Sequence, residues 1–337
     1  MKIILTGGGT AGHVNPNIAL IEPLKNMGYD IYYIGSETGI EKQLVKDIPY
    51  YEIPTGKLRR YISVKNFTDI FKIIKGFLKS LRIISQIKPD IVFSKGGFVV
   101  VPVLYAAWFK RIKIIIHESD ITLGLASRLT IPIAKTICYS FPETKLPKRA
   151  ILTGLPIRAD LLNGSKQKGL EITGLNLNKP IILFMGGSMG SAIINDCLRG
   201  CLQELLKDFQ IIHLCGKGNM QNIYLEGYVQ FEYTDIADLY AIADMVVSRA
   251  GATTVFELLE LCKPNILIPL SKKASRGDQM LNAKSFELNG FSYVLQEEDL
   301  KNLDFAIKQV YKNKDMYIKN MKAQNKSNAT QNIINLI

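Results

Sequence analysis

The stretch KIILTGGG at residues 2–9 decides the fold, and it has a counterpart near mid-chain, PIILFMGGS at residues 180–188. Each is a short apolar run that enters a glycine turn. Each is followed by a segment of helical character, from about Asn15 in the first case and about Ala192 in the second. A strand, a glycine turn and a helix in this order open a Rossmann-like domain. The repetition therefore predicts two such domains in tandem.

Apolar runs alternate with amphipathic segments along the whole chain. The runs at residues 31–34, 91–93, 114–116, 211–214, 245–247 and 266–268 are typical of strands buried in a parallel sheet. They predict the α/β class, with two doubly wound domains that face each other across a deep cleft. We expect these domains at residues 1–160 and 161–320, with a polar linker near residues 163–169. A last helix, in residues 321–337, is expected to pack back on the first domain.

The composition indicates a reducing compartment and an anionic partner. The 337 residues are 47% hydrophobic and 21% charged, as in ordinary globular proteins, and the formal net charge is +12. Five cysteines without a CxxC pair disfavour a disulfide framework. The apolar start is too short for a signal peptide, and no apolar stretch reaches the ~20 residues that span a bilayer. We expect a cytoplasmic protein with an anionic ligand: nucleic acid, acidic lipid or a phosphorylated substrate.

Three glycine turns at strand ends are candidate phosphate-binding loops, at residues 7–12, 186–190 and 248–254. Glycine lets the backbone approach a phosphate, and the following helix offers free N–H groups and the positive end of its dipole. Gly7, Gly9 and Gly12 also fit the GxGxxG spacing of nicotinamide enzymes. That interpretation is disfavoured because the second strand ends at Gly35 without the required acidic residue. The alternative for any single loop is a tight turn that binds nothing.

Glu257 lies one turn into the helix that follows the third loop. A carboxylate there can accept hydrogen bonds from a ribose diol, or it can simply complement the helix dipole. The chain has no DxD pair, the usual device by which sugar transferases hold a nucleotide through a divalent cation, and no histidine cluster has zinc spacing. We therefore expect neither a metal nor a cofactor. A leaving diphosphate would be stabilised by helix ends and backbone amides.

Six segments, in this order, resemble the MurG family of glycosyltransferases. They are GGTAGH (8–13), HE (117–118), GLPIR (154–158), GGSMG (186–190), SRAGATTVFE (248–257) and DQMLNA (278–283). Any one of them is a weak signal, but an unrelated α/β protein would not share the ordered set. The resemblance implies a GT-B fold and an enzyme of peptidoglycan synthesis. The implied reaction transfers N-acetylglucosamine with inversion from UDP-N-acetylglucosamine to the C4 hydroxyl of the muramyl sugar of lipid I, the undecaprenyl-diphosphate-linked acceptor, to form lipid II.

The resemblance also implies roles for individual residues. On the donor side Ser188 would hold the diphosphate, Glu257 the ribose hydroxyls and Gln279 the transferred sugar. The other donor contacts it implies are Arg158, Ile236, which frames the uracil, and Ala252, Thr253, Thr254 and Val255. The residues it places at the reacting centre are Thr10, Ala11, Gly12 and His13.

The chain departs from the family pattern directly after His117 and Glu118. Ser119-Asp120 stands where family members often have Gln-Asn, so an amide that can donate becomes a carboxylate that cannot. Asp120 is therefore a candidate substrate contact with altered chemistry. Neither this change nor the smaller departures at Leu155 and Asp278 removes a residue assigned to catalysis.

An inverting transfer needs a base for the acceptor hydroxyl, and imidazole suits this near neutral pH. His13 ends the first glycine loop, where the positive end of the next helix favours the neutral ring. Its rival is His117, which we expect to be kept charged by Glu118 and Asp120 and thus to be a weaker base. The alternative for His13 is a role as a hydrogen-bond donor to the acceptor diphosphate.

Residues 57–88 carry nine basic side chains and a single acid, Asp69. The basic side chains that share one face of the predicted helix are Lys72, Lys75, Lys79 and Arg82, and the apolar ones that share another are Ile70, Ile74, Phe77, Leu81 and Ile84. A basic amphipathic helix suits an anionic membrane surface, and Trp108 adds an interfacial aromatic. The alternative is a core-facing stripe with a solvated charged back. No nucleic-acid-binding module is visible. We expect a peripheral protein on the cytoplasmic face of the cell membrane.

Three other functions remain open from the sequence alone. A related transferase that glycosylates a simpler membrane lipid would share the donor half and differ in its acceptor. A nicotinamide oxidoreductase would bind the reduced cofactor. A non-enzymatic basic adaptor would bind anionic liposomes and ignore UDP-sugars.

Overall fold

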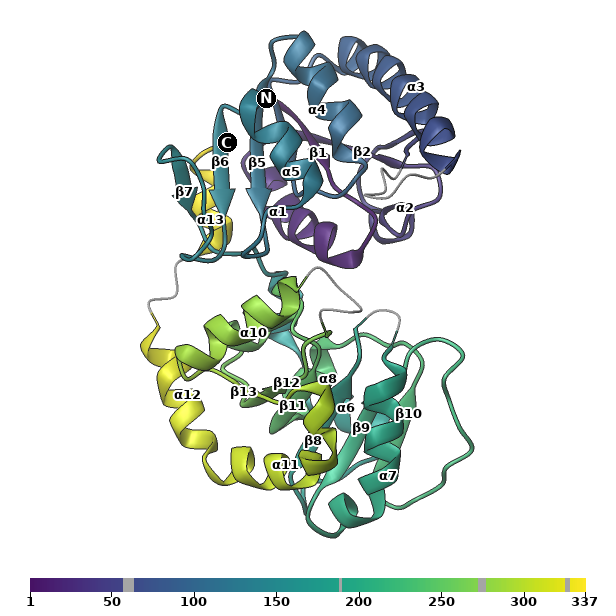
Figure 1. The fold of residues 1–337 in the computed structure, drawn as a ribbon, viewed down its shortest axis with the longest axis vertical. Coiled ribbons are helices and arrows are strands. Elements are labelled where there is room, and N and C mark those ends of the chain that lie inside the picture. The colour runs from purple at the N-terminus through teal and green to yellow at the C-terminus, as the bar shows by residue number, and fades with distance from the viewer. Residues whose placement is uncertain (57–63, 188–189, 272–276, 325–327) are drawn as a thin grey trace. The chain divides into compact units, whose positions relative to one another are not determined.

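The computed structural model describes residues 1–56, 64–187, 190–271, 277–324 and 328–337. The chain folds into two compact units (Figure 1). The first comprises Met1–Arg158 together with Ser327–Ile337, and the second comprises Ala159–Lys326. Each unit is built on its own parallel sheet with helices on both faces. The prediction of two Rossmann-like doubly wound domains is confirmed.

The first unit contains a seven-stranded parallel sheet in the order β3-β2-β1-β4-β5-β6-β7. Its strands are β1 (Lys2–Thr6), β2 (Asp30–Ser36), β3 (Tyr50–Ile53), β4 (Ile91–Ser94), β5 (Lys113–Glu118), β6 (Thr136–Tyr139) and β7 (Ala150–Leu152). Its helices are η1 (Ala11–His13), α1 (Asn15–Asn26), α2 (Glu41–Leu44), α3 (Val64–Ile87), α4 (Val100–Phe109), α5 (Leu125–Thr130), η2 (Ile131–Ile133) and α13 (Ala329–Ile334). Because β1 lies between β2 and β4, its glycine turn emerges beside the end of β4.

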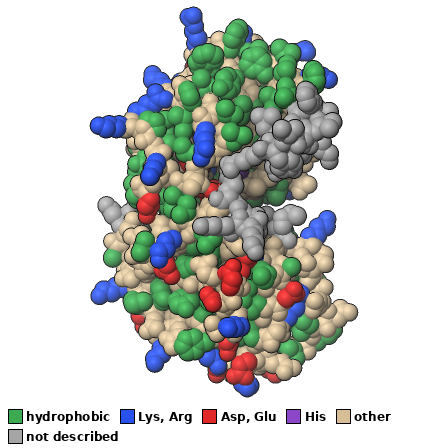
Figure 2. Space-filling model, viewed as in Figure 1, with side chains coloured by type: hydrophobic (Ala, Val, Ile, Leu, Met, Phe, Trp, Pro, Cys, Tyr) green, Lys and Arg blue, Asp and Glu red, His purple; other side chains and the backbone are tan. Residues whose placement is uncertain are grey.

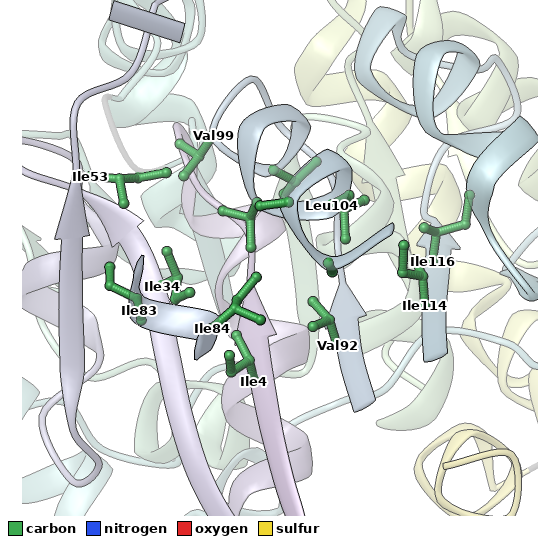
Figure 3. Packing of buried hydrophobic residues seen from close by; sticks show 14 of the residues in the cluster. Ile4, Ile34, Ile53, Ile83, Ile84, Val92, Val99, Leu104, Ile114 and Ile116 are labelled. Carbon is green, nitrogen blue, oxygen red and sulfur yellow. The ribbon is translucent and has the colours of Figure 1, made fainter. Parts of the chain in front are cut away.

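Side chains along β1 point alternately to the two faces of the sheet, so the core of the first unit has two layers. Ile4 packs on one face with Ile84 of α3 and Leu104 of α4, as Figure 3 shows. Ile3 and Leu5 pack on the opposite face with residues of α1 and α13. All three β1 side chains are fully buried. Burial on both faces explains why the strands are continuous apolar runs instead of alternating ones.

The C-terminal helix α13 belongs to the first unit. Ile333 and Ile334 are buried in the layer formed with α1. The Lys113 ammonium donates to the carbonyl oxygens of Leu336 at 2.7 Å and Ile337 at 3.2 Å. These bonds attach the residues after α13 to Lys113 at the start of β5. The chain therefore returns to the first unit after completing the second.

The second unit contains a six-stranded parallel sheet in the order β10-β9-β8-β11-β12-β13. Its strands are β8 (Ile181–Met185), β9 (Gln210–Leu214), β10 (Tyr228–Phe231), β11 (Met245–Ser248), β12 (Asn265–Leu267) and β13 (Tyr293–Val294). Its helices are η3 (Ala159–Asn163), α6 (Lys166–Thr173), α7 (Ala192–Asp208), α8 (Ala237–Ile242), α9 (Ala252–Glu260), α10 (Asp278–Leu288), η4 (Glu297–Asn302), α11 (Leu303–Lys312) and α12 (Lys314–Ala323). The central pair β8 and β11 carries the two glycine turns of this unit.

The polar segment at residues 163–169 is not the linker that its composition predicted. Most of it lies in α6, whose N-cap residue Ser165 accepts a hydrogen bond from the backbone N–H of Lys168. Gly169 packs so closely on α8 that a Cβ atom would lie 2.5 Å from the Asp238 carbonyl oxygen. The segment is polar because it belongs to an outer helix, and the passage between units falls at Arg158 and Ala159.

None of the helices within the described ranges is both long enough and apolar enough to cross a membrane.

Candidate active site

The first glycine turn is shaped by close backbone packing. Gly9 has a φ of +88°, and Gly97, in the turn after β4, has a φ of +86°. A Cβ atom on Gly97 would lie 2.1 Å from the Gly8 carbonyl oxygen. Only glycine tolerates both the positive φ and this contact. The turns that follow β1 and β4 are thus fitted directly against each other.

Glu41 holds the first glycine turn from inside the protein. Its side chain is fully buried, and Oε2 accepts a hydrogen bond from the Gly9 N–H at 3.2 Å. Oε1 accepts from the Ser36 N–H at 3.0 Å and from the Ser36 hydroxyl at 2.5 Å. A carboxylate that accepts several N–H and O–H bonds is well compensated for burial. Glu41 has no local sequence signal, because its contact with Gly9 depends on the tertiary fold.

The segment after this turn forms the entry to α1, as predicted, and it consists of Thr10, Ala11, Gly12 and His13. The Thr10 hydroxyl lies 3.2 Å from Nδ1 of His13. The edge of the His13 ring lies over Gly96, where a Cβ atom would be 3.6 Å from Cδ2 and 3.8 Å from Nε2. Both Thr10 and the imidazole have solvent access. If Nδ1 carries the proton and donates to Thr10, Nε2 is the nitrogen that can accept a proton from a substrate.

His117 is neutral, contrary to the expectation that Glu118 and Asp120 keep it charged. Burial, followed by the charge of Lys95, holds the pKa of His117 well below its usual range. Nε2 donates to the Gly154 carbonyl oxygen at 2.8 Å, so Nδ1 accepts from the Lys95 ammonium at 2.6 Å. The prediction was wrong because it considered neighbours in sequence and missed Lys95, which reaches the ring from the adjacent strand.

Lys95 is a buried cation that sequence reasoning missed. Its side chain is 1% exposed and also donates to the Ser119 hydroxyl at 2.5 Å. Burial lowers the pKa of Lys95 to about 7, although the carboxylates of Glu118 and Asp120 act in the opposite direction. The sequence does hold a signal for this lysine, because it stands between an apolar run and two glycines. In the structure this places it where the turn after β4 lies beside the turn after β1.

The loop after β5 is folded around the carboxylate of Glu118. Its Oε1 accepts from the backbone N–H of Ser119 at 3.0 Å and of Asp120 at 3.3 Å, and its Oε2 accepts from Gly124 at 3.3 Å. Burial raises the pKa of Glu118. Asp120 is half-buried at the start of this loop. The structure thus places Asp120, His117 and His13 in the first unit, at the carboxyl ends of β5 and β1.

The second glycine turn, after β8, uses left-handed glycines as the first one does. Gly187 has a φ of +88° and Gly190 a φ of +75°. A Cβ atom on Gly190 would lie 2.2 Å from the Cys215 carbonyl oxygen. Ser188, the predicted diphosphate contact, lies outside the described residues. Ser191 precedes the 17-residue helix α7.

Arg249 connects the second and third glycine turns. It is buried, and Nη2 donates to the Ser191 hydroxyl at 2.8 Å while Nη1 pairs with the Glu297 carboxylate at 2.7 Å. The same Nη1 also donates to the Ile268 carbonyl oxygen at 3.1 Å. The planar guanidinium suits several acceptors at once. Arg249 belongs to the SRAGATTVFE motif, but its contacts with Ser191 and Glu297 depend on the tertiary fold and leave no local sequence signal.

Glu257 is buried one turn into α9, where Oε2 accepts a hydrogen bond from the Tyr240 hydroxyl at 3.3 Å. The predicted contacts Ala252, Thr253, Thr254 and Val255 form the first turn of the same helix. Ile236 is half-buried directly before α8, which carries Tyr240. These residues therefore gather at the carboxyl end of the second sheet, with a helix N-terminus among them.

Gln279 and Arg158 have different surroundings. Gln279 is in the first turn of α10, and its Oε1 accepts from the Leu270 N–H at 3.1 Å, which ties it to the segment after β12. Asn282 of the same helix donates to the Ala250 carbonyl oxygen at 3.3 Å, which joins α10 to the third glycine turn. Arg158 is the last residue of the first unit and is half-buried.

Within the residues that the structure describes, no group of His, Cys, Asp and Glu side chains is arranged to hold a metal ion.

The outer face of α3 carries apolar and basic side chains together. Lys72, Lys75, Lys79 and Arg82 are all exposed. Phe77, Leu81 and Ile84 pack on the core as predicted, but Ile70 and Ile74 do not, since they are 46% and 50% exposed. Among the side chains of α3 and the neighbouring α4 that the structure describes, the exposed apolar ones are Ile70, Phe71, Ile74, Leu78, Trp108 and Phe109. Figure 2 shows hydrophobic side chains gathered over these helices, and an exposed apolar patch of this kind commonly marks an interaction surface.

Comparisons with known proteins agree with this architecture. Residues 3–139 match the glycosyltransferase family 28 N-terminal domain and residues 181–337 match its C-terminal domain. The chain is 54% identical to a UDP-N-acetylglucosamine--N-acetylmuramyl-(pentapeptide) pyrophosphoryl-undecaprenol N-acetylglucosamine transferase of Clostridium tetani, over 100% of the chain and 97% of the relative. An enzyme of the same name from Lachnospira eligens is also 54% identical, over 100% and 98%.

A solved structure matches the whole chain as well. The crystal structure of Acinetobacter baumannii MurG aligns with a TM-score of 0.76 and 27% identity, over 100% of the chain and 98% of that structure. The predicted GT-B fold class is thereby confirmed.

The buried Lys95 should make stability increase with pH. Burial lowers its pKa from 10.5 to about 7, so between these values the unfolded chain binds a proton that the folded chain does not. Through Lys95 alone, the free energy of unfolding should rise with pH between these two values, by at most about 1 kcal/mol per pH unit. Lys95→Met removes this contribution.

Denaturant unfolding of both proteins from about pH 7 to about pH 9 measures the difference. The wild type should gain stability relative to the variant as pH rises. The range ends there because burial raises the pKa of the Cys138 thiol to about 12, which acts in the opposite direction at higher pH. Parallel pH profiles for the two proteins would contradict the prediction.

Proposed function

The chain belongs to glycosyltransferase family 28, and from that premise we propose that it transfers N-acetylglucosamine from UDP-N-acetylglucosamine to lipid I to form lipid II. The observation that carries the proposal is the 54% identity over the full chain to curated enzymes named for this reaction. Apart from Arg158, the proposed donor-binding residues lie in the second unit, and the proposed acceptor-binding residues, with the base, lie in the first.

The second unit is suited to a nucleotide diphosphate sugar. Its two glycine turns precede the helices α7 and α9, whose first N–H groups and dipoles favour a diphosphate. Arg249 braces both turns, so they keep one geometry as charge develops on the leaving UDP. Glu257 is positioned on α9 to accept from the ribose hydroxyls, and Ile236 lies where a uracil ring would be framed. Gln279 serves the hydroxyls of the transferred sugar.

In the first unit, His13 acts as the base. The acceptor C4 hydroxyl attacks the anomeric carbon, the bond to the UDP oxygen breaks with inversion, and Nε2 of His13 takes the hydroxyl proton. The Thr10 hydroxyl lies 3.2 Å from Nδ1 and supports this role in the tautomer in which Nδ1–H donates to it, because Nε2 is then the basic nitrogen. His117 is unsuited to it, since both of its ring nitrogens are engaged inside the protein. Thr10, Ala11, Gly12 and Asp120 contact the acceptor.

We also propose that the outer face of α3 and α4 binds the anionic surface of the membrane, on its cytoplasmic side, where the lipid acceptor is found. Exposed apolar side chains can enter the headgroup region while neighbouring lysines meet anionic lipids. Trp108 and Phe109 lie at the end of α4 beside Lys110 and Arg111, all of them exposed. This arrangement keeps the protein peripheral.

Transfer of labelled N-acetylglucosamine to a lipid I analogue, with UDP release measured alongside, tests the proposed reaction. Equal amounts of product and UDP are expected. Transfer to diacylglycerol instead of lipid I would favour a simpler lipid glycosyltransferase. Liposome binding without any sugar transfer would favour a non-enzymatic adaptor.

Glu257→Ala should weaken binding of UDP-N-acetylglucosamine by roughly 2 kcal/mol, or about 30-fold in Kd, because it removes hydrogen bonds to a charged acceptor. Calorimetry with the donor alone measures this. Tyr240→Phe is the matched control, since it removes the hydroxyl that Glu257 accepts from and keeps the carboxylate. An unchanged Kd in Glu257→Ala would remove this residue from the donor site.

Reversing two charges on α3 should weaken membrane binding. Lys75→Glu with Arg82→Glu should reduce co-sedimentation with anionic vesicles at low salt, at about 1 kcal/mol for each basic side chain lost near the surface. The control is Lys217→Glu with Lys301→Glu, which makes the same change in net charge on exposed residues of the second unit. If both pairs reduce binding equally, net charge and not the α3 face is responsible.

His13→Ala should lower kcat by roughly 10²–10⁴-fold, the span usual for general acid–base catalysis. Donor affinity should stay nearly intact, because every proposed donor contact except Arg158 lies in the other unit. Thr10→Val should have a smaller effect, since it removes only the group that fixes the tautomer. A variant with normal kcat and a raised KM for the acceptor would assign His13 to acceptor binding instead.

A further inference from the structure

His213 is a histidine that the proposed reaction does not use. It lies in β9, near the carboxyl end of the strand, and is 1% exposed. Burial, followed by the positive charge of Arg199, lowers the pKa of His213 to about 4, so the ring is neutral near pH 7. Nδ1 lies 2.9 Å from the Tyr228 hydroxyl, and Nε2 lies 2.9 Å from Oδ1 of Asn195. The side chains of Asn195, His213 and Tyr228 are all buried, and together they form a buried network.

The backbone carbonyl of Cys215 sets the direction of every hydrogen bond in the buried network. A carbonyl oxygen can only accept, so the atom of Asn195 that faces it at 2.9 Å is the amide nitrogen Nδ2. Oδ1 of Asn195 therefore accepts from Nε2–H of His213. Nδ1 of the neutral ring then accepts from the Tyr228 hydroxyl. The buried network is thus ordered from Tyr228 through His213 and Asn195 to Cys215.

The Cys215 carbonyl oxygen also lies directly against the end of the second glycine turn. A Cβ atom on Gly190 would be 2.2 Å from this oxygen and 3.0 Å from Cα of Gly216. The Cys215 N–H donates to the Phe231 carbonyl oxygen at 3.0 Å, which ties the same residue to the end of β10. Cys215 is therefore a fixed surface against which Gly190 packs.

Asn195 connects this contact to the start of α7. It is the fourth residue of the helix, and its N–H donates to the Ser191 carbonyl oxygen at 2.9 Å. The Ser191 hydroxyl accepts from Arg249, which belongs to the third glycine turn. The start of α7 is thus held by two buried side chains, one neutral and one charged.

We propose that the buried network positions Gly190 and the start of α7 for the donor diphosphate, with Asn195 and His213 as positioning residues that act through Cys215. The inference rests on the proposed function, since it concerns how the donor site keeps its geometry. A loop that is already held in place loses less conformational freedom when its ligand binds. Because the network is neutral, it holds the loop without placing a further charge beside the diphosphate.

Two substitutions of His213 each keep one of its two hydrogen bonds. The amide nitrogen of glutamine reaches as far as Nε2, so His213→Gln can still donate to Asn195. The amide of asparagine reaches only as far as Nδ1, so His213→Asn keeps the bond to Tyr228 and loses the one to Asn195. By calorimetry, His213→Asn should weaken UDP binding by at least about ten-fold, because Asn195 is no longer held against Cys215. His213→Gln should lose at most about three-fold.

Uridine, which lacks the diphosphate, shows whether the loss is local. In His213→Asn the affinity for uridine, measured by ligand-observed NMR, should change by less than about two-fold, because the diphosphate alone meets the α7 start. Thermal unfolding should show similar losses of stability in the two variants, since each loses one buried hydrogen bond. Equal losses of UDP affinity in both variants, or an equal loss for uridine, would overturn the proposal, because a general disturbance of the second unit produces either result.

Asn195→Asp tests the same point if His213→Asn fails to fold. Its carboxylate still accepts from His213 but turns a second acceptor toward the Cys215 carbonyl oxygen, so UDP binding should again fall by at least about ten-fold. Tyr228→Phe is the control and should lose less, since it leaves the bond between Asn195 and Cys215 in place. Normal UDP affinity in Asn195→Asp would overturn the proposal. A wild type that binds neither UDP nor UDP-N-acetylglucosamine would instead refute the proposed function itself.

Discussion

The contact between the backbones of Gly8 and Gly97 is the constraint on which the first half of the site depends. A single Cβ atom on Gly97 would overlap the Gly8 carbonyl oxygen, so the turns after β1 and β4 can approach only as glycines. This approach places the His13 ring over Gly96 and directs the neighbouring Lys95 into the protein. The accessible imidazole of His13 and the buried ammonium of Lys95 therefore belong to the two segments that this contact holds together. Larger residues at either turn would separate the two strands' ends and the groups that they carry.

The two units share a topology and fix their loops by the same physical means. In the first unit, the buried carboxylates of Glu41 and Glu118 accept the N–H groups of loop backbones. In the second, the buried Arg249 binds loop oxygens and is neutralised by Glu297. Buried charges of this kind contribute little net stability, because desolvation offsets most of the attraction. Their effect is geometric, since each charge specifies the position of several backbone groups at once. Loops that must bind phosphate or sugar without rearranging are where such precision is useful.

Much of the fold could be predicted from the sequence, because strands buried on both faces and glycine turns leave local signals. The entry to α1 at Asn15 and that to α7 at Ala192 are examples. The face of α3 could not be predicted from periodicity alone. At 24 residues the helix is roughly 36 Å long, whereas β4 beneath it has four residues, so only part of α3 can pack on the sheet. Ile84 lies in the packed part and Ile70 does not.

The candidate site shows the same division between local and tertiary information. Motif residues such as His13 and Glu257 follow from turns and helix starts, which are local. Their electrostatic surroundings do not, and His117 is the clearest case. Its sequence neighbours Glu118 and Asp120 favour a charged ring, but burial and the ammonium of Lys95 dominate and keep it neutral. A base must exchange a proton with its substrate, and a ring whose nitrogens are bound to Lys95 and Gly154 cannot do so without breaking a buried network. His117 therefore serves as a fixed structural link between β4, β5 and the segment after β7. This supports the proposal that His13, whose ring has solvent access, is the base.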